Sequence, residues 1–422
     1  MIRTIRALLL SGASVLAACG GAQKPVAPPV TAAPKVTIKP RDIVASANEK
    51  LQAGKAEEAI AELDTLIEKQ PDNTVAIYNR GLAQHRLGNW QKAEADYRTV
   101  LAADPKDESA AVNLGAVLRE QGKVDEAIKV YEAQLENDEF DGDLLNNLSV
   151  LYREKKDYER SIGAIRKLLM RDKNNVDAYK NLALVYFAQD KLRLSQTILE
   201  NARSMAEEQG KKDPDIFVNL GMIYLGKNEN GRAMAAFKRA LELEPEHTEA
   251  NYNIGALALS HRDYDLAAKS YEVVSKALPT SADVAASLGY AYQGQQKLEQ
   301  AIGALERAWD LQKKAGKSSQ DDQVLYQLTV IAQNAQQLDK AKGYAESYMQ
   351  RNKLSCSAED FEGFCGRYNG INMMIQMEKE ATAPAPAAEE GTKATGRDIF
   401  TEEEGGEAEP APAPEGEGGD GA

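Results

Sequence analysis

The sequence predicts an all-α fold, a right-handed superhelix of about nine helix-turn-helix repeats. Three observations predict this class. One small residue recurs at intervals of 34 residues, or slightly more, along most of the chain. A second small or short residue lies twelve positions before each copy, and proline recurs at one phase of the period. A fixed period of this length is typical of solenoids, in which each unit packs only on its neighbours.

Two rows of small or short side chains define the register of the repeats. The later row is Ala59, Ala93, Ala127, Ser161, Ser195, Ala233, Ala267, Ala301 and Ala341. The earlier row is Ala47, Gly81, Gly115, Ser149, Ala183, Gly221, Gly255, Gly289 and Thr329. A unit of this length fits two antiparallel helices, and small residues on both would let them approach closely. We therefore expect nine repeats over residues 41–355.

Bulky and helix-breaking residues fit the same register. A bulky residue follows the later small residue by four positions in most copies, at Tyr97, Tyr131, Ile165, Phe237 and Tyr271. We expect these side chains to fill the space between helices. The second helices should end near Pro71, Pro105, Pro245 and Pro279, because proline cannot continue a helix. Two insertions, in "EEQGKKDP" and "LQKKAGKSSQDD", are expected to lengthen connections between repeats.

The repeat pattern is clearest in "YNRGLAQHRLGNWQKAEADYRTVLAADP" and "FVNLGMIYLGKNENGRAMAAFKRALELEP". It resembles the tetratricopeptide repeat (TPR). The resemblance implies a solenoid of paired helices with a concave groove that binds other proteins. No metal, cofactor or catalytic site is expected, because the three histidines are scattered and no familiar catalytic or nucleotide-binding motif occurs. We therefore expect a binding protein and not an enzyme.

The first 18 residues predict an export signal. Arg3 and Arg6 precede an apolar stretch about half as long as the roughly 20 residues of a spanning helix. Leu16, Ala17 and Ala18 then lead directly to Cys19, an order that resembles the bacterial lipobox. This resemblance implies removal of residues 1–18 and a lipid, with chains such as palmitate, on Cys19. An ordinary secretory signal followed by a chance cysteine is the alternative.

The lipid would attach the protein to a membrane, and the residues after Cys19 indicate which membrane. The two positions after Cys19 are glycines and lack the aspartate that retains proteobacterial lipoproteins in the inner membrane. We therefore expect an outer-membrane anchor facing the periplasm. Residues 19–40 contain five prolines and predict a stiff, extended tether.

The two chain ends differ sharply in charge. Residues 381–422 consist largely of Ala, Pro, Gly and Glu, and we expect an acidic disordered tail. Eleven Asp or Glu against two basic residues in this tail supply much of the formal net charge of −14. Such acidity argues against nucleic acid as a partner.

The remaining cysteines, Cys356 and Cys365, form an even pair after lipidation of Cys19. An exported protein permits a disulfide between them, which would pin a cap over residues 356–380. Two free thiols are the alternative. A zinc site would need four ligands, and no histidine lies within about ninety residues of the pair.

A row of asparagines marks the predicted binding groove. Each lies two residues before the short residue of a first helix: Asn79, Asn113, Asn147, Asn181, Asn219 and Asn253. The row resembles the asparagine ladder of O-linked N-acetylglucosamine transferase, which holds an extended peptide by its main chain. An amide both donates and accepts hydrogen bonds, which suits backbone recognition. The alternative is that asparagine is simply common at this position of such repeats.

Further groove residues are predicted from neighbouring positions of the first helices. Aromatic and arginine side chains dominate interface energetics. The candidates are Arg119, Arg153, Lys180 and Tyr252, with Tyr78, Asn146, Phe187 and Tyr290 beside them. The three cations would favour an acidic stretch of ligand. They do not reproduce the carboxylate clamp of chaperone-binding relatives, since the ninth positions hold Ala116, Val150 and Leu184. An idle, solvated face is the alternative.

The layout as a whole resembles the TPR lipoprotein of the myxobacterial adventurous gliding machinery. This resemblance implies an outer-membrane-anchored periplasmic scaffold that binds other envelope proteins, with gliding motility as its setting. Two alternatives stay open: a pilotin-like lipoprotein for assembly of a type IV pilus secretin, and an activator of cell-wall enzymes.

Overall fold

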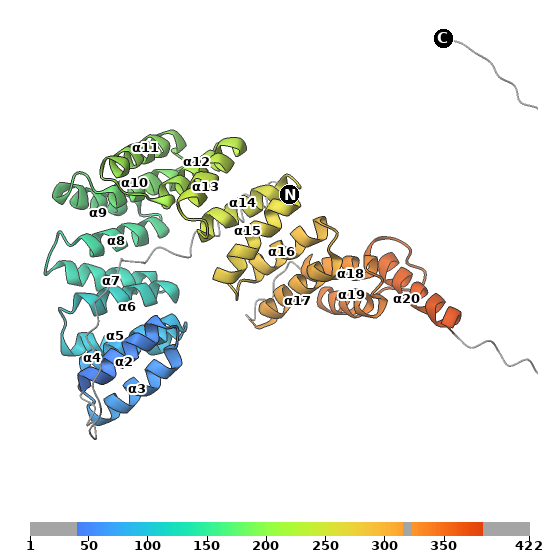
Figure 1. Cartoon of the computed structure of the whole chain (residues 1–422), viewed down its shortest axis with the longest axis horizontal. Coiled ribbons are helices and arrows are strands. Elements are labelled where there is room, and N and C mark those ends of the chain that lie inside the picture. Colours follow the sequence, from blue (N-terminus) through green and yellow to red (C-terminus); the bar gives the residue numbers. More distant parts are fainter. Residues whose placement is uncertain (1–39, 315–322, 383–422) are drawn as a thin grey trace, which may run out of the picture.

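The computed structural model describes residues 40–314 and 323–382, and this part of the chain consists of nineteen helices without strands (Figure 1). The all-α superhelix predicted from the sequence is confirmed. The signal, Cys19, nearly all of the tether and the tail beyond Thr382 lie outside the described residues.

The helices alternate between two positions of the repeat. The first helices are α2 (Pro40–Gln52), α4 (Thr74–Arg86), α6 (Glu108–Glu120), α8 (Gly142–Glu154), α10 (Val176–Ala188), α12 (Pro214–Gly226), α14 (Thr248–Ser260), α16 (Ala282–Gly294) and α18 (Gln323–Asn334). The second helices are α3 (Ala56–Lys69), α5 (Trp90–Ala103), α7 (Val124–Leu135), α9 (Tyr158–Arg171), α11 (Leu192–Glu208), α13 (Asn230–Leu243), α15 (Tyr264–Ala277), α17 (Leu298–Lys314) and α19 (Leu338–Asn352). A last helix, α20 (Gly363–Thr382), follows the ninth pair.

The small residues lie where the two helices of a repeat meet. Every member of the later row, from Ala59 to Ala341, has a relative exposure of 0 %. Where this residue is a serine, its hydroxyl is satisfied across the pair: Ser161 Oγ donates to the carbonyl of Ser149 at 2.6 Å, and Ser195 Oγ to that of Ala183 at 2.6 Å. Small residues therefore let the two helices of each repeat pack closely, as inferred from the sequence.

Side-chain volumes are complementary across each helix pair. Where the first helix supplies glycine, an aromatic ring or a leucine of the second helix occupies the space that a Cβ would need. These pairs are Gly81 with Tyr97, Gly115 with Tyr131, Gly221 with Phe237, Gly255 with Tyr271 and Gly289 with Leu305. Where the first helix carries Thr329, the equivalent position of the second helix is only Ala345.

The turn between the two helices places one residue in the left-handed region. Glycine occupies this position in the first three repeats, with φ between 73° and 76°. The later repeats use other residues, namely Lys156, Asp190, Asn228, Arg262, Gln296 and Gln336, with φ between 58° and 61°. Side chains with a Cβ are disfavoured there, so these turns carry a local cost that the packed helices offset.

One sequence expectation is wrong in detail. The insertion after the fifth repeat mainly lengthens α11, which has 17 residues against 14 in α9 and α13, and does not mainly lengthen the connection. The apolar side of α11 continues through Ala202 and Ala206, which are both buried, so the extra turn gains core contacts. The second insertion falls partly on residues 315–322, outside the described residues.

The last helix covers the end of the solenoid. Ile371 of α20 is fully buried in the core formed by α16 to α19. Rings of Tyr326, Tyr348 and Phe364 also pack together, with centroid separations between 4.2 and 6.0 Å. The ninth repeat therefore does not present its apolar side to solvent, which a solenoid end must avoid.

Candidate protein-binding site

Most first helices contact the first helix of the next repeat. Consecutive first helices contact each other directly in the pairs α2 with α4, α4 with α6, α6 with α8, α8 with α10, α10 with α12, and α14 with α16. Such contacts place the first helices on the inner, shorter side of a curved stack, whose concave surface is where solenoids bind partners. We call the solvent-facing positions of these helices the first-helix face.

Three asparagines of the row are anchored to their own helix. Their Nδ2 atoms donate to the carbonyl four residues earlier: Asn79 to Val75 at 2.7 Å, Asn113 to Ser109 at 2.8 Å and Asn253 to Glu249 at 2.8 Å. This bond fixes the side-chain amide. Among the described residues, none donates a hydrogen bond to an Oδ1 atom of the six-asparagine row. Asn79 and Asn253 are buried, whereas Asn113, Asn147, Asn181 and Asn219 are partly exposed and can present this oxygen to a ligand.

Two further bonds link the row between repeats. Asn113 Nδ2 also donates to the hydroxyl of Tyr78 at 2.9 Å, and Asn181 Nδ2 donates to Asn146 Oδ1. Asn147 and Asn219 form no side-chain hydrogen bond within residues 40–314 and 323–382, and both are partly exposed. The six asparagines thus lie at equivalent positions of successive first helices, and the protein itself uses part of their hydrogen-bonding capacity.

Two of the three predicted basic residues, Arg119 and Lys180, form ion pairs within the protein. Arg119 of α6 pairs with Glu154 of α8. Lys180 of α10 contacts Asp177 at 2.8 Å and Asp213 at 2.7 Å. Burial opposes the charge of Lys180, but its hydrogen bonds to these two aspartates outweigh burial and raise its pKa. Both side chains therefore tie neighbouring repeats together.

Arg153 differs from the other two cations. It is partly buried on α8, and no described residue forms a hydrogen bond or ion pair with its guanidinium. Burial lowers its pKa, the nearby charge of Arg119 lowers it further, and Glu154 only partly compensates.

The predicted tyrosine of the face packs on the core. The ring of Tyr252 meets that of Tyr271 edge-on at 5.9 Å, and Tyr78 meets Tyr97 at 5.8 Å in the second repeat. Burial raises the pKa of Tyr252, and so does the charge of Asp283. Tyr97 and Tyr271 are buried, whereas Tyr78 and Tyr252 remain partly exposed and present apolar area beside the asparagine row.

The sequence reasoning missed an acidic row on the same face. The second residue of five successive first helices is Asp143, Asp177, Asp215, Glu249 and Asp283. The sequence contains this signal, because the five residues follow the repeat period, and four of them lie four positions before an asparagine of the row. Acidic side chains in a first turn interact favourably with the helix dipole, which explains the row without a ligand.

Two carboxyls of the acidic row, those of Asp215 and Glu249, have shifted pKa values. Asp215 Oδ1 lies 3.0 Å from His247 Nε2, and this bond lowers the pKa of Asp215 and raises that of His247. Ala250 N donates to His247 Nδ1, so Nε2 carries the proton that Asp215 accepts. Burial, and then the charge of Asp215, raise the pKa of Glu249 to about 7.

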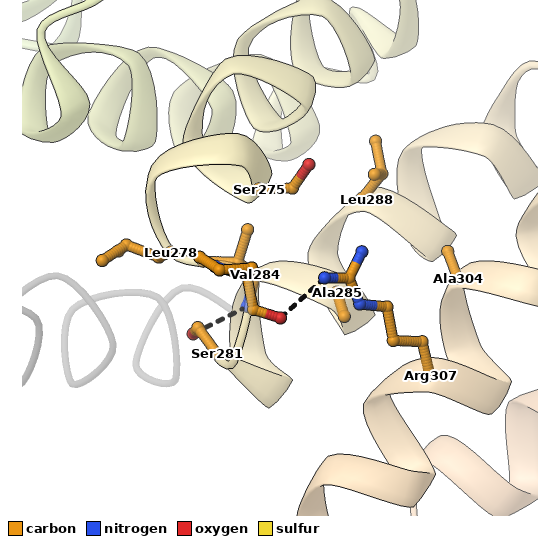
Figure 2. A pocket seen from close by; sticks show the side chains of 9 residues that line it. Ser275, Leu278, Ser281, Val284, Ala285, Leu288, Ala304 and Arg307 are labelled. Carbon is orange, nitrogen blue, oxygen red and sulfur yellow. Dashed lines mark hydrogen bonds between the residues drawn. The ribbon is translucent and has the colours of Figure 1, made fainter. Parts of the chain in front are cut away.

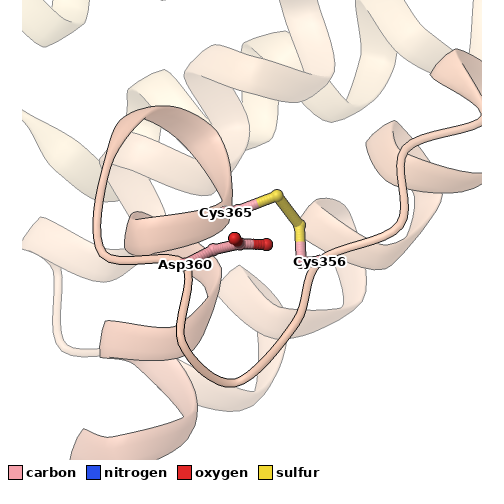
Figure 3. A group of neighbouring side chains, drawn as sticks. All are labelled: Cys356, Asp360 and Cys365. Carbon is pink, nitrogen blue, oxygen red and sulfur yellow. A yellow bond between two sulfur atoms is a disulfide. The ribbon is translucent and has the colours of Figure 1, made fainter.

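The cysteine pair lies at the start of α20. Cys356 and Cys365 are joined by a disulfide with a Cα–Cα distance of 5.2 Å (Figure 3). Asp360 lies beside the two sulfurs, a grouping that could hold a metal. Both sulfurs are bonded to each other, however, and Asp360 Oδ2 accepts from Ser357 N at 2.7 Å. The group is therefore a covalent clip on the loop before α20.

The small pocket in Figure 2 is a packing gap. It lies between α15, α16 and α17 and encloses about 40 Å³. Leu278, Val284 and Leu288 line it, and Arg307 closes one side by donating to the carbonyl of Pro279 at 2.7 Å. Pockets for small molecules are typically about 300 to 1,000 Å³, so this gap suits no such ligand.

Known proteins identify the repeats. A family model described as "Tetratricopeptide repeat" matches residues 44–108, 78–143, 112–177 and 218–282. The repeats in these ranges are therefore tetratricopeptide repeats, and the described helices form the solenoid that such repeats build. Repeats of this kind typically act as protein-protein interaction scaffolds.

Individual known proteins are similar to parts of the chain. The curated mouse protein "BBSome complex member BBS4" is 26 % identical over 159 residues, 30 % of this chain and 29 % of that protein. The chain thus spans under a third of the length of this relative. A solved tetratricopeptide repeat protein from Parabacteroides merdae has a TM-score of 0.51 at 18 % identity, covering 60 % of this chain and 98 % of its own. PilW, described as a type IV pilus biogenesis factor, has a TM-score of 0.43 at 15 % identity, covering 50 % of this chain and 97 % of its own.

Over residues 40–314 and 323–382, every helix is too short or too polar to cross a bilayer.

Proposed function

We propose that this protein is an envelope scaffold that holds extended segments of other proteins against its first-helix face. The observation that carries the proposal is the asparagine row, whose six Oδ1 atoms lack a donor among the described residues. Backbone N–H groups of an extended segment would supply such donors. The anchoring bonds to Val75, Ser109 and Glu249 support this role, because they hold the amides in place before a ligand arrives.

The proposal includes an outer-membrane location facing the periplasm, with the lipid on Cys19. It is supported by the lipobox-like order of Leu16, Ala17, Ala18 and Cys19, and by the glycines that follow. Replacing Cys19 by alanine should release the protein from membranes. Membrane association of the Cys19→Ala variant without its partners would argue against the anchor.

The machine we propose is the gliding motility complex, and it is supported by the layout of anchor, tether, long repeat array and acidic tail. Deletion should disturb localisation of other envelope proteins while their expression stays normal. Secreted protein without the lipid should fail to restore movement. Defects in secretin assembly or in peptidoglycan composition would favour the pilotin-like or wall-enzyme alternative.

The binding face is tested by replacing Asn113, Asn147 and Asn181 together with alanine. Helicity should persist because alanine is the better helix former, while affinity for a partner identified by pulldown with the lipidated protein should fall. The matched control replaces Gln91, Lys129 and Glu159, which are exposed on α5, α7 and α9, and it leaves the net charge unchanged. Equal affinity of both triple variants and the wild type, with normal folding, would contradict the proposal.

A further inference from the structure

We propose that Arg153 is a receptor for a carboxylate, and that the segment bound by the first-helix face carries an acidic side chain at the fourth repeat. The proposal rests on the proposed function, because it names the chemistry of the ligand on that face. The sequence suggested three cations that favour an acidic ligand. Of these three, only Arg153 lacks a carboxylate partner among the described residues, since Arg119 and Lys180 already have one.

Arg153 has no charged partner among the described residues. Its guanidinium carries five N–H donors, and none of them reaches an acceptor within residues 40–314 and 323–382. The carboxylate nearest in sequence, Glu154, receives two hydrogen bonds from Arg119 of the preceding repeat. Glu154 is therefore already bound by Arg119, and the positive charge of Arg153 is left without a carboxylate partner among the described residues.

Partial burial makes the unpaired charge of Arg153 unfavourable. A charged group taken partly out of water without a partner is destabilising, and native proteins pair such groups or expose them fully. Arg153 does neither, because it is partly buried and unpaired. Loss of hydration also lowers its pKa. A structural role would normally provide a protein acceptor, as it does for Arg119. A carboxylate from outside would instead complete a balanced group of two cations and two anions.

The surroundings fit an extended segment. Asn147 lies on the same helix six residues earlier, about 9 Å along the axis, and it also lacks a side-chain partner among the described residues. An extended chain advances about 3.3 to 3.6 Å per residue. Asn147 and Arg153 also lie about 120° apart around the axis of α8, so a backbone that meets Asn147 needs at least about three residues to place a side chain at Arg153.

The acidic row restricts where an anionic side chain can lie. Asp143 lies near the start of α8, ten residues before Arg153 and thus about 15 Å away along the axis. An acidic residue of a ligand is therefore repelled at one end of the face and attracted at the other. An acidic side chain at the Arg153 end gives both register and direction to the bound segment.

Two acetylated, amidated ten-residue peptides test the proposal on the full chain: alternating alanine and glutamate, and alternating alanine and glutamine. Fluorescence anisotropy should show binding of the glutamate peptide at low ionic strength and at least tenfold weaker binding of the glutamine peptide. Arg153→Met should weaken the glutamate peptide at least tenfold. The control Arg166→Met, an exposed arginine on α9 with the same change in charge, should leave affinity unchanged.

Stability separates this role from a structural one. Removing an unpaired, partly buried charge should leave the melting temperature of Arg153→Met unchanged or raise it, whereas a structural arginine would lower it. Arg153→Lys should retain part of the binding, because it keeps the charge and loses the planar donor set.

Several outcomes would overturn the proposal. These are equal affinity of wild type and Arg153→Met, equal affinity of the two peptides, or no binding of the glutamate peptide. A third peptide, the glutamine sequence with a free C-terminus, is measured beside them, and binding of this peptide without binding of the glutamate peptide would assign Arg153 to a chain-terminal carboxylate instead. If Arg153 fails but the triple asparagine variant still loses its partner, the proposed function stands without this receptor.

Discussion

A Cβ on Gly115 of α6 would overlap the phenol ring of Tyr131 of α7. The ring is 2 % exposed, and its hydroxyl donates to the carbonyl of Val112 at 3.0 Å, which holds it in place. A glycine inside a helix is normally unfavourable by up to about 1 kcal/mol relative to alanine. Here the missing side chain instead allows an aromatic residue to fill the helix pair.

Gly115→Ala should therefore destabilise the protein by about 1 to 3 kcal/mol through overpacking, against the usual helix preference. Gly163 is the matched control, because it lies inside α9 and a Cβ there would meet no atom within 4 Å. Gly163→Ala should stabilise by a few tenths to about 1 kcal/mol. Urea unfolding followed by circular dichroism measures both. A stabilised Gly115→Ala variant would contradict the expected overpacking.

The left-handed turn residues predict a second stability change. Lys156 and Arg262 occupy, with φ of 61°, the position that Gly122 occupies with φ of 74°. Lys156→Gly and Arg262→Gly should each stabilise by about 1 kcal/mol, since glycine adopts this conformation without strain. The reverse change, Gly122→Ala, should destabilise by a similar amount. Thermal unfolding of the three variants tests this, and a lower melting temperature for both glycine variants would refute it.

Glu249 predicts a pH-dependent stability. Its pKa is raised to about 7, so between its ordinary value of 4.5 and about 7 the folded state holds a proton that the unfolded state has released. Raising the pH through this window therefore destabilises the fold. Glu249→Gln should remove this loss, so its advantage over wild type should grow from pH 5 to pH 8. Urea titrations at both pH values measure it.

The contribution of His247 to the pH dependence of stability must be separated from that of Glu249, because both reduce stability as the pH rises. The pKa of His247 is raised by Asp215, so its contribution is present below its ordinary pKa of 6.5 and disappears as the pH rises through its folded value. Repeating the comparison in a His247→Gln background isolates Glu249. An unchanged difference between pH 5 and pH 8 in that background would count against the raised pKa.

The disulfide predicts a local effect. Closing a loop of about ten residues contributes roughly 2 to 3 kcal/mol in the chain-entropy model. Replacing Cys356 and Cys365 by serine should therefore increase hydrogen exchange in α20 and α19 and leave α4 to α8 unchanged, since each repeat contacts only its neighbours. Alkylation of two thiols in oxidised, secreted protein would show that the bond does not form in the cell.

Much of the fold follows from periodicity. The rows containing Ala93 and Gly81 repeat the same spacing in every unit, so helix pairing and close packing could be inferred before any coordinates. The length of α11 could not, because it depends on whether Ala206 finds a core to pack against. Local sequence permits both a helix and a loop at that point, and tertiary contacts decide.

The sequence predicts where the residues of the candidate site lie, but it does not predict their hydrogen-bond and ion-pair partners. The first-helix locations of Asn147 and Arg153 follow from the repeat. Their hydrogen-bonding state does not, because it depends on partners about 35 residues away. Asn181 meets Asn146, and Arg119 meets Glu154, each 35 residues apart. A single-repeat pattern does not show that one cation is paired and its neighbour is not.

Site-specific photo-crosslinking in living cells tests the scaffold proposal most directly. A photoreactive amino acid at position 147, on the first-helix face, is compared with the same residue at position 159, which is exposed on α9. The account predicts covalent adducts with envelope proteins from position 147, few or none from position 159, and loss of the position 147 adducts when Asn113 and Asn181 are also alanine. Equal adducts from both positions, or none from position 147 with normally folded and lipidated protein, would contradict it.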